Sequence, residues 1–178
     1  MSSPIDDSRD AAPARDIGLL GALAYEAYAD GLRRYLAEHG HPDVRAVDTQ
    51  LFRLLDARGG ATVTEIARAR GVSKQAASQH IAQFVARGYG EQRPSPGDAR
   101  ERIVTLTERA RAARRTGIEY ADRIAAQLTA ELGAETVDAG RRVLERVIAM
   151  HLDEASEFVR AGARIGADRP PPRTDHAP

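Results

Sequence analysis

Apolar side chains recur at steps of three and four along residues 17–38, a spacing that predicts one long amphipathic helix. Residues 39–43 combine histidine, glycine and proline and are expected to end this helix. The same apolar spacing resumes at about Val44 or Asp48 and continues to Ala57, so a second, shorter helix is predicted there.

Two further helices are predicted on either side of a glycine. Thr62 and Glu65 have the spacing of a capping box, in which each side chain satisfies a free backbone N–H of the first helical turn. Gly71 ends this third helix, and Ser73 is placed to cap a fourth one that extends to about Arg87. Glycine adopts a positive φ easily, so Gly71 can form the tight turn between the third and fourth helices. These two helices are therefore expected to form a helix-turn-helix.

The spacing changes from helical to alternating after this fourth helix. Residues 89–93 and 102–106 are predicted to be two short strands, and the prolines and glycine between them favour a turn, so the segment is expected to form a hairpin with a long charged loop. Helical spacing returns over residues 108–131 and again from 134 to about 162.

This order predicts a mainly α fold with a small β-hairpin wing, namely a winged helix-turn-helix flanked by long dimerisation helices. We place an N-terminal dimerisation helix at 16–45, the winged helix-turn-helix at 46–110 and the C-terminal dimerisation helices at 111–163. The long helices carry more apolar surface than one small winged domain covers, so a homodimer is expected. Segments 1–15 and 164–178 lack periodicity and are expected to be disordered tails.

The composition excludes several classes of protein. None of the 178 residues is a cysteine, which excludes disulfides, thiolate zinc sites and cysteine nucleophiles. The longest nearly apolar run, residues 18–24, is far too short to cross a bilayer, and the acidic N-terminus lacks the form of a secretory signal. We therefore expect a cytoplasmic protein without membrane association. No motif of an enzyme active site or cofactor site stands out, so we expect neither catalysis nor a cofactor.

The formal net charge is zero, but the charges are unevenly distributed along the chain. Residues 58–115 carry 12 basic and 5 acidic side chains, whereas residues 1–57 carry 6 and 10, and residues 116–178 carry 8 and 11. A basic middle segment between acidic flanks indicates contact with a polyanion such as DNA.

The predicted fourth helix has a polar face without a carboxylate, opposite Ile81 and Phe84. Hydroxyls, amides and an ammonium are groups that bond phosphates and base edges in the major groove. We expect this face to bind DNA and the nearby arginines to add positive charge. The polar residues are Ser73, Lys74, Gln75, Ser78 and Gln79, and the flanking arginines are Arg68, Arg70, Arg87 and Arg93.

In the hairpin loop, Asp98 is placed to hold Arg100 toward a minor groove, and an ordinary charged turn is the alternative.

These segments resemble the MarR (multiple antibiotic resistance regulator) family of bacterial transcription factors. The resemblance covers residues 17 to about 160 and rests on stretches that agree in order and spacing. They are 64–67, 71–79, 87–89, 93–100 and 104–107, with Asp98, Arg100, Leu106 and Thr107 in the register of the family's wing.

The resemblance implies a homodimer whose two recognition helices and wings face one pseudopalindromic duplex, with half-sites about one helical turn apart. Gln79 departs from the family pattern, because many relatives have arginine there, and His80 stands at a usually apolar place. We expect His80 to lie partly exposed beside the core rather than to contact DNA. The implied DNA-binding residues are Ser73, Lys74, Gln75, Ala76, Ser78, Gln79, Arg93, Asp98, Arg100 and Arg102.

Members of this family often bind a small aromatic or anionic effector between the dimerisation helices and the DNA-binding lobe. The candidates here are Tyr25, Tyr28, His41, Arg45 and Arg53, and core packing is the alternative for the two tyrosines. The urate-sensing branch uses a tryptophan in its first helix, and this chain has none. His39 and His41 have the spacing of a partial metal site, but we favour a polar loop and expect no metal.

We therefore interpret the chain as a dimeric DNA-binding transcriptional regulator, a repressor released from its operator by a small effector. The alternative is a winged-helix module that binds protein partners without sequence-specific DNA binding. The basic middle segment argues against this alternative.

Overall fold

The computed structural model describes residues 17–94 and 102–150 of the chain. The predicted mainly α fold with a small β wing is confirmed, and the expected tails and the end of the last predicted helix lie outside the described residues. In chain order the elements are α1 (Ile17–Glu38), α2 (Ala46–Arg58), β1 (Ala61–Thr62), α3 (Val63–Arg70), α4 (Lys74–Ala86), β2 (Gly90–Pro94), β3 (Arg102–Leu106), α5 (Glu108–Leu132) and α6 (Ala134–Met150).

The helix-turn-helix of α3 and α4 forms for the local reasons that the sequence indicates. Thr62 Oγ1 accepts from Glu65 N–H at 3.2 Å while Glu65 Oε2 accepts from Thr62 N–H at 2.8 Å, which completes the capping box. Gly71 follows α3 with a φ of 65°, a conformation that other residues rarely adopt. Ser73 Oγ then accepts from Ala76 N–H at 3.1 Å and caps α4.

The wing is a three-stranded antiparallel sheet rather than the predicted hairpin of two strands. Its order is β1-β3-β2, and β1 pairs Ala61 with Val104 and Thr62 with Ile103. A strand of two residues is too short to show alternation in the sequence, so periodicity alone did not indicate it. Because β1 directly precedes α3, its pairing with β3 holds the start of α3 against the wing.

A core of aliphatic and aromatic side chains joins α2, α4 and the wing into one lobe. Phe52, Phe84 and Tyr89 are buried, and their ring centroids lie 5.6 to 5.9 Å apart. Such separations are typical of favourable aromatic pairs. Leu51 and Ile81, both fully buried, extend this core along α2 and α4.

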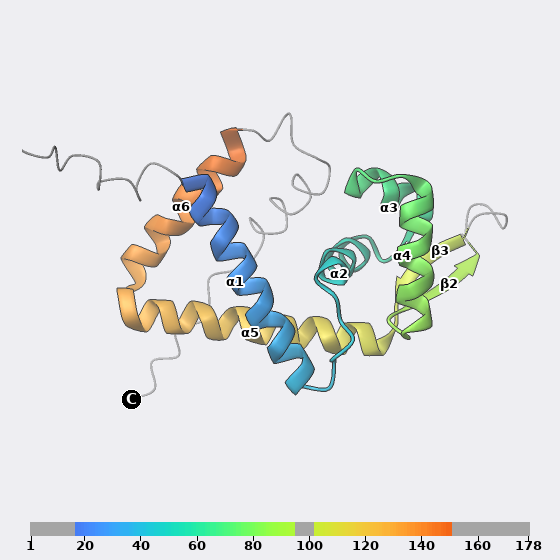
Figure 1. Cartoon of the computed structure of the whole chain (residues 1–178), viewed down its shortest axis with the longest axis horizontal. Helices are drawn as coiled ribbons and strands as arrows, with labels where there is room; N and C mark the ends of the chain where they lie inside the picture. Colours follow the sequence, from blue (N-terminus) through green and yellow to red (C-terminus); the bar gives the residue numbers. More distant parts are fainter. Residues whose placement is uncertain (1–16, 95–101, 151–178) are drawn as a thin grey trace, which may run out of the picture.

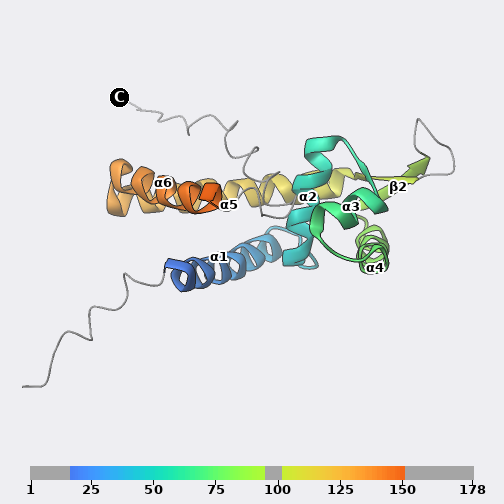
Figure 2. The ribbon, with the colours of Figure 1, turned by 90° about the horizontal axis from the view of Figure 1, so that it is seen from above.

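Three helices extend away from this lobe (Figures 1 and 2). α1 packs along α5, where Tyr120 lies 5.2 Å from Tyr28 and 5.4 Å from Tyr35 between ring centroids. Seen from above, α1 and α6 are separate arms (Figure 2), and α6 has no buried residue. Both arms therefore expose large apolar side chains, among them Leu19, Leu20, Leu23, Val143, Leu144, Val147 and Ile148. None of the helices in the described part of the chain has a length and hydrophobicity compatible with spanning a bilayer.

Gly90 offers a test of this packing. A Cβ at this position would lie 2.7 Å from Phe84 Cδ1 and 2.9 Å from Phe84 Cε1, and Phe84 is fully buried. Because the ring has no room to move, Gly90→Ala is expected to lower the free energy of unfolding by about 1–3 kcal/mol in chemical denaturation.

Gly117→Ala is the matched control, because its Cβ would meet Leu32 Cδ1 at an ordinary 3.8 Å. This variant lies inside α5 and is expected to keep or raise the stability, since alanine favours helix more than glycine. Equal stability of Gly90→Ala and the native chain would contradict the packing described for β2.

Candidate nucleic-acid interface

The polar face of α4 lies where the sequence predicts it. Ala77, Ile81 and Phe84 are buried against the core, so the opposite side of the helix is directed to solvent. The helix contains no carboxylate. The exposed residues of its N-terminal half are Lys74, Gln75, Ala76, Ser78 and Gln79, preceded by the exposed cap Ser73.

The wing adds two exposed arginines to this region. Arg93 on β2 is paired with Ile103, and Arg102 on β3 is paired with Pro94, so the two arginines occupy neighbouring positions of the ladder. Arg102 Nη2 also donates to the carbonyl oxygen of Gln92 at 3.4 Å. Asp98 and Arg100, predicted to act together in the loop, lie outside the described residues.

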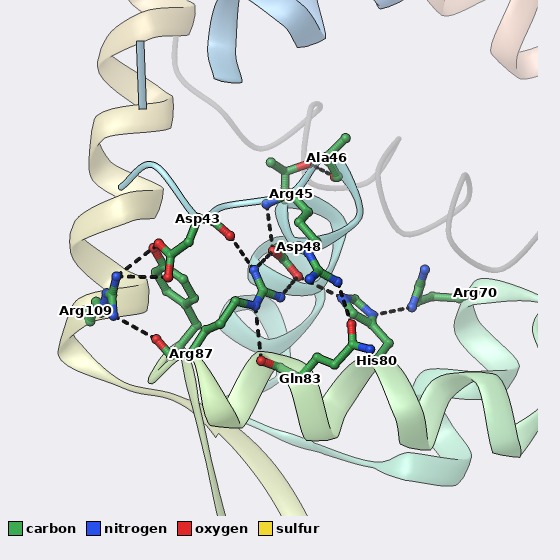
Figure 3. A network of polar contacts seen from close by, with 11 residues as sticks. Asp43, Arg45, Ala46, Asp48, Arg70, His80, Gln83, Arg87 and Arg109 are labelled. Atoms are coloured by element: carbon green, nitrogen blue, oxygen red, sulfur yellow. Dashed lines mark hydrogen bonds and ion pairs between the residues drawn. The ribbon is translucent and has the colours of Figure 1, made fainter. Parts of the chain in front are cut away.

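A buried carboxylate holds α4 against the start of α2 (Figure 3). Asp48 is 0% exposed and accepts from Arg87 Nη1 at 2.6 Å and from Arg87 Nη2 at 2.9 Å. His80 Nε2 donates to Asp48 Oδ1 at 2.8 Å, and Arg45 N–H donates to Asp48 Oδ2 at 2.8 Å. We call Asp48, Arg45, His80 and Arg87 the Asp48 cluster.

The hydrogen bonds within the Asp48 cluster determine its charges. Burial alone raises the pKa of Asp48, but the hydrogen bonds from His80, Arg87 and the Arg45 N–H outweigh burial and bring this pKa to about 2. Arg70 Nη1 lies 2.8 Å from His80 Nδ1 and can only donate, so Nδ1 accepts and Nε2 carries the proton. The cluster is therefore an ionised Asp48 bound to a cationic Arg87 and a neutral His80.

A second carboxylate connects the segment before α2 to the wing and to α5. Asp43 Oδ1 accepts from the Tyr89 hydroxyl at 2.6 Å and from Arg109 Nη2 at 3.0 Å. Burial and the hydrogen bond to Asp43 raise the pKa of Tyr89 to about 12. Arg87 Nη1 donates to the Asp43 carbonyl oxygen and Arg109 Nη1 to the Arg87 carbonyl oxygen, so the two carboxylates share one network.

Two of the predicted flanking arginines do not add charge to the exposed polar face of α4. The Arg87 side chain is 15% exposed and turned toward Asp48, and Arg70 is bonded to His80. The expectation that they flank the interface is therefore wrong. The sequence does contain a sign of this arrangement, because Asp48 precedes Leu51 and Leu55 at helical spacing and so lies on the buried face of α2. A carboxylate on a buried face requires a cationic partner.

A cavity of about 540 Å³ lies among α1, α2 and α5. It brings together four of the five predicted effector residues, Tyr25, Tyr28, Arg45 and Arg53. Among the described residues, the lining includes no carboxylate but two more arginines, Arg33 and Arg114. Its walls therefore combine apolar and aromatic surface with positive charge.

The two histidines of the loop before α2 do not act together. His41, the fifth predicted effector residue, is not part of the cavity lining and lies 6.5 Å from the Tyr89 ring. Burial and the charge of Arg109 lower its pKa. His39 instead stacks on Tyr35 at 4.0 Å. Within residues 17–94 and 102–150, no group of three metal-ligating side chains is found.

The pKa of Asp48 leads to a test by pH. The pKa of about 2 in the folded state is below the ordinary 3.8, so the folded chain binds this proton less tightly than the unfolded chain. The resulting stabilisation, roughly 2 kcal/mol, is complete above about pH 5 and is lost as the pH falls toward about 2. Asp48→Asn is expected to lower the free energy of unfolding at neutral pH by about 2–4 kcal/mol, because Arg87 loses its counterion.

Chemical denaturation at several pH values measures both effects. The Asp48→Asn variant is expected to lose less stability than the native chain as the medium becomes acidic, because the titrating carboxyl is gone. Glu119→Gln, which removes an exposed carboxylate on α5, controls for the loss of one charge. Parallel acid dependence of the native chain and Asp48→Asn would contradict the assignment.

Comparison with known proteins agrees with this geometry. The chain matches the model of the MarR family over residues 43–101, which span α2, the helix-turn-helix and β2. A search of curated protein sequences finds no match. Among solved structures, the reduced form of MarR from E. coli superimposes with a TM-score of 0.62 at 22% identity, covering 74% of this chain and 95% of that one.

Two further solved structures contain DNA. A cysteine-to-serine mutant of MarR from E. coli complexed with operator DNA has a TM-score of 0.59 at 21% identity, covering 75% of this chain and 94% of that one. The transcriptional repressor CouR, bound to a 23-mer DNA duplex, has a TM-score of 0.59 at 25% identity, covering 74% and 91%. The family match over residues 43–101, the shared fold and the exposed face of α4 show that this chain is similar to the winged-helix regulators of the MarR family.

Proposed function

We propose that the chain is a dimeric repressor that binds a pseudopalindromic operator and is released from it by a small organic anion. The observation that carries the DNA part is the exposed, carboxylate-free face of α4, formed by Lys74, Gln75, Ser78 and Gln79. This choice of side chains suits phosphates and base edges of a major groove. The DNA bound by the CouR and MarR structures supports the same use of the fold.

Each contact residue has a role that its chemistry suggests. Gln75 and Gln79 offer amides to base edges, while Lys74, Ser73 and Ser78 offer donors to phosphates. Arg93 and Arg102 bring the wing to the adjacent backbone or minor groove. Ala76 lies exposed among these residues, where its small side chain permits close approach.

The two separate arms support a homodimer. Leu23 on α1 is 57% exposed and Leu144 on α6 is 55% exposed, and apolar side chains continue along both helices. A second copy would cover these stripes and place two α4 helices on one duplex. Sedimentation is expected to give about twice 19.3 kDa.

The cavity supports the effector part of the proposal. Its aromatic and aliphatic lining suits an apolar body, and its arginines suit a carboxylate. It is lined by α1 and α5 on one side and by α2, which belongs to the winged-helix lobe, on the other, so a ligand there contacts both parts of the molecule. We therefore expect an aromatic or aliphatic carboxylate rather than a cation.

Two substitutions on α4 test the DNA-binding assignment with an operator recovered from a random duplex library. Gln75→Ala is expected to relax the base preference at one position, since a good bidentate contact contributes about 1–3 kcal/mol of discrimination. Lys74→Ala is expected to weaken binding to most sequences alike and to lower the salt dependence by about one counterion.

Gln127→Ala, at an exposed glutamine on α5, is the matched control and is expected to leave operator binding unchanged. All three variants should sediment as the native dimer, which excludes misfolding as the cause. If no duplex is retarded by the native chain at moderate salt, the proposal is wrong and the protein-interaction alternative is favoured.

A further inference from the structure

The first turn of α2 faces the cavity on one side and α4 on the other. Val44, Arg45, Ala46 and Thr49 line the cavity. From the same turn, Asp48 and Arg45 bind side chains of α4 (Figure 3). A ligand in the cavity therefore lies against the segment that holds the helix with the candidate DNA contacts.

Three residues on one flank of α4 bind this turn. His80, Gln83 and Arg87 are spaced by three and four residues, so they lie above one another on the helix surface. His80 and Arg87 bind the buried Asp48, whereas the Gln83 side-chain oxygen accepts from Arg45 Nη1. Of these contacts, the pair of Arg45 and Gln83 is the exposed one, and its acceptor is neutral.

Arg45 differs from two other arginines of the cavity, Arg33 and Arg114, because its Nη1 has a neutral acceptor. Arg33 pairs with Asp30 at 2.7 Å and Arg114 pairs with Asp56 at 2.9 Å, so each is bound to a carboxylate. Arg45 Nη1 is bound to an amide oxygen. A carboxylate forms a stronger, charge-assisted bond with a guanidinium than an amide does, so an anion in the cavity competes for Arg45 with advantage.

We propose that Arg45 exchanges partners: it binds Gln83 on α4 when the cavity is empty and the carboxylate of an apolar organic acid when the cavity is filled. The exchange releases one of the three contacts on this flank of α4, while the Asp48 contacts keep the helix attached. This inference rests on the proposed function and names Arg45 and Gln83 as the positioning residues through which the ligand acts. By linkage, a ligand that loosens α4 binds less tightly when operator DNA holds α4 in place.

Substitution of Gln83 tests the exchange through ligand affinity, with no DNA present. The probe is naphthoate, a two-ring carboxylate, and binding to the full-length dimer is measured by calorimetry. Gln83→Ala removes the competing acceptor and is expected to tighten naphthoate binding about two- to tenfold. Gln83→Glu gives Arg45 a charged partner and is expected to weaken binding about two- to fivefold.

Three controls separate this exchange from a structural effect. Naphthamide, the neutral analogue, is expected to show much smaller shifts between the two Gln83 variants, because its amide oxygen forms a weaker bond with the guanidinium than a carboxylate does. In an Arg45→Ala background, Gln83→Ala and Gln83→Glu should no longer shift naphthoate affinity in opposite directions. Gln127→Ala and Gln127→Glu, at an exposed position of α5 outside the cavity lining, should leave the affinity unchanged.

The outcomes distinguish this inference from the proposed function. If naphthoate binds the native dimer and both Gln83 substitutions shift its affinity in the same direction or not at all, the exchange is wrong while the effector site remains. If naphthoate does not bind the native dimer at millimolar concentration, both the exchange and the effector part of the proposed function are wrong. Opposite shifts that are as large with naphthamide as with naphthoate would also overturn the exchange, since charge would then not be the cause.

Discussion

The position of α4, the helix that carries the candidate DNA contacts, depends on one buried carboxylate. Asp48 is 0% exposed, and an ionised group in such a place is tolerated only when charged and polar partners surround it. The partners are the Arg45 N–H just before α2, the His80 side chain on the flank of α4, and the Arg87 guanidinium just after the end of α4. Because removing any of them leaves a buried charge incompletely paired, α2 and α4 have one favourable arrangement, and the polar face of α4 points outward as a result.

This constraint connects parts of the molecule that have different tasks. His80 on one flank of α4 and Arg87 just after its end are bound to α2, the side with Ile81 enters the core, and the remaining side is exposed to solvent. The turn of α2 that supplies Asp48 also forms one wall of the cavity. The cavity, the core and the exposed polar face of α4 are thus connected through a few residues.

Local chemistry allowed much of this to be predicted from the sequence. The caps at Thr62 and Ser73, the turn at Gly71 and the two wing strands follow from short-range preferences, and all are confirmed. Tyr25, Tyr28, Arg45 and Arg53 line one cavity, and their role in binding an effector stays a prediction. The features that the sequence did not indicate depend on contacts between residues that are distant in the chain. Strand β1 is one of them, because its two residues form a strand only by pairing with β3.

The directions of charged side chains were the main error. Arg70 and Arg87 were expected to flank the DNA, because an arginine near a polar face usually reaches solvent. They turn inward instead, since Asp48 and His80 offer them partners in the lobe. His41 similarly packs toward Tyr89 rather than into the cavity. Predicting these three side-chain directions would have required knowing which carboxylate or ring the fold places beside each residue.

Hydrogen exchange on the Asp48→Asn variant, compared with the native protein at neutral pH, tests the central claim most directly. If Asp48 holds α4 in place, the amides of residues 80–87 should lose protection in the variant by more than those of α3, which is held by its own cap and by buried Ile66 and Ala69. Equal protection of α4 in the two proteins, or an equal loss in α3 and α4, would contradict the account.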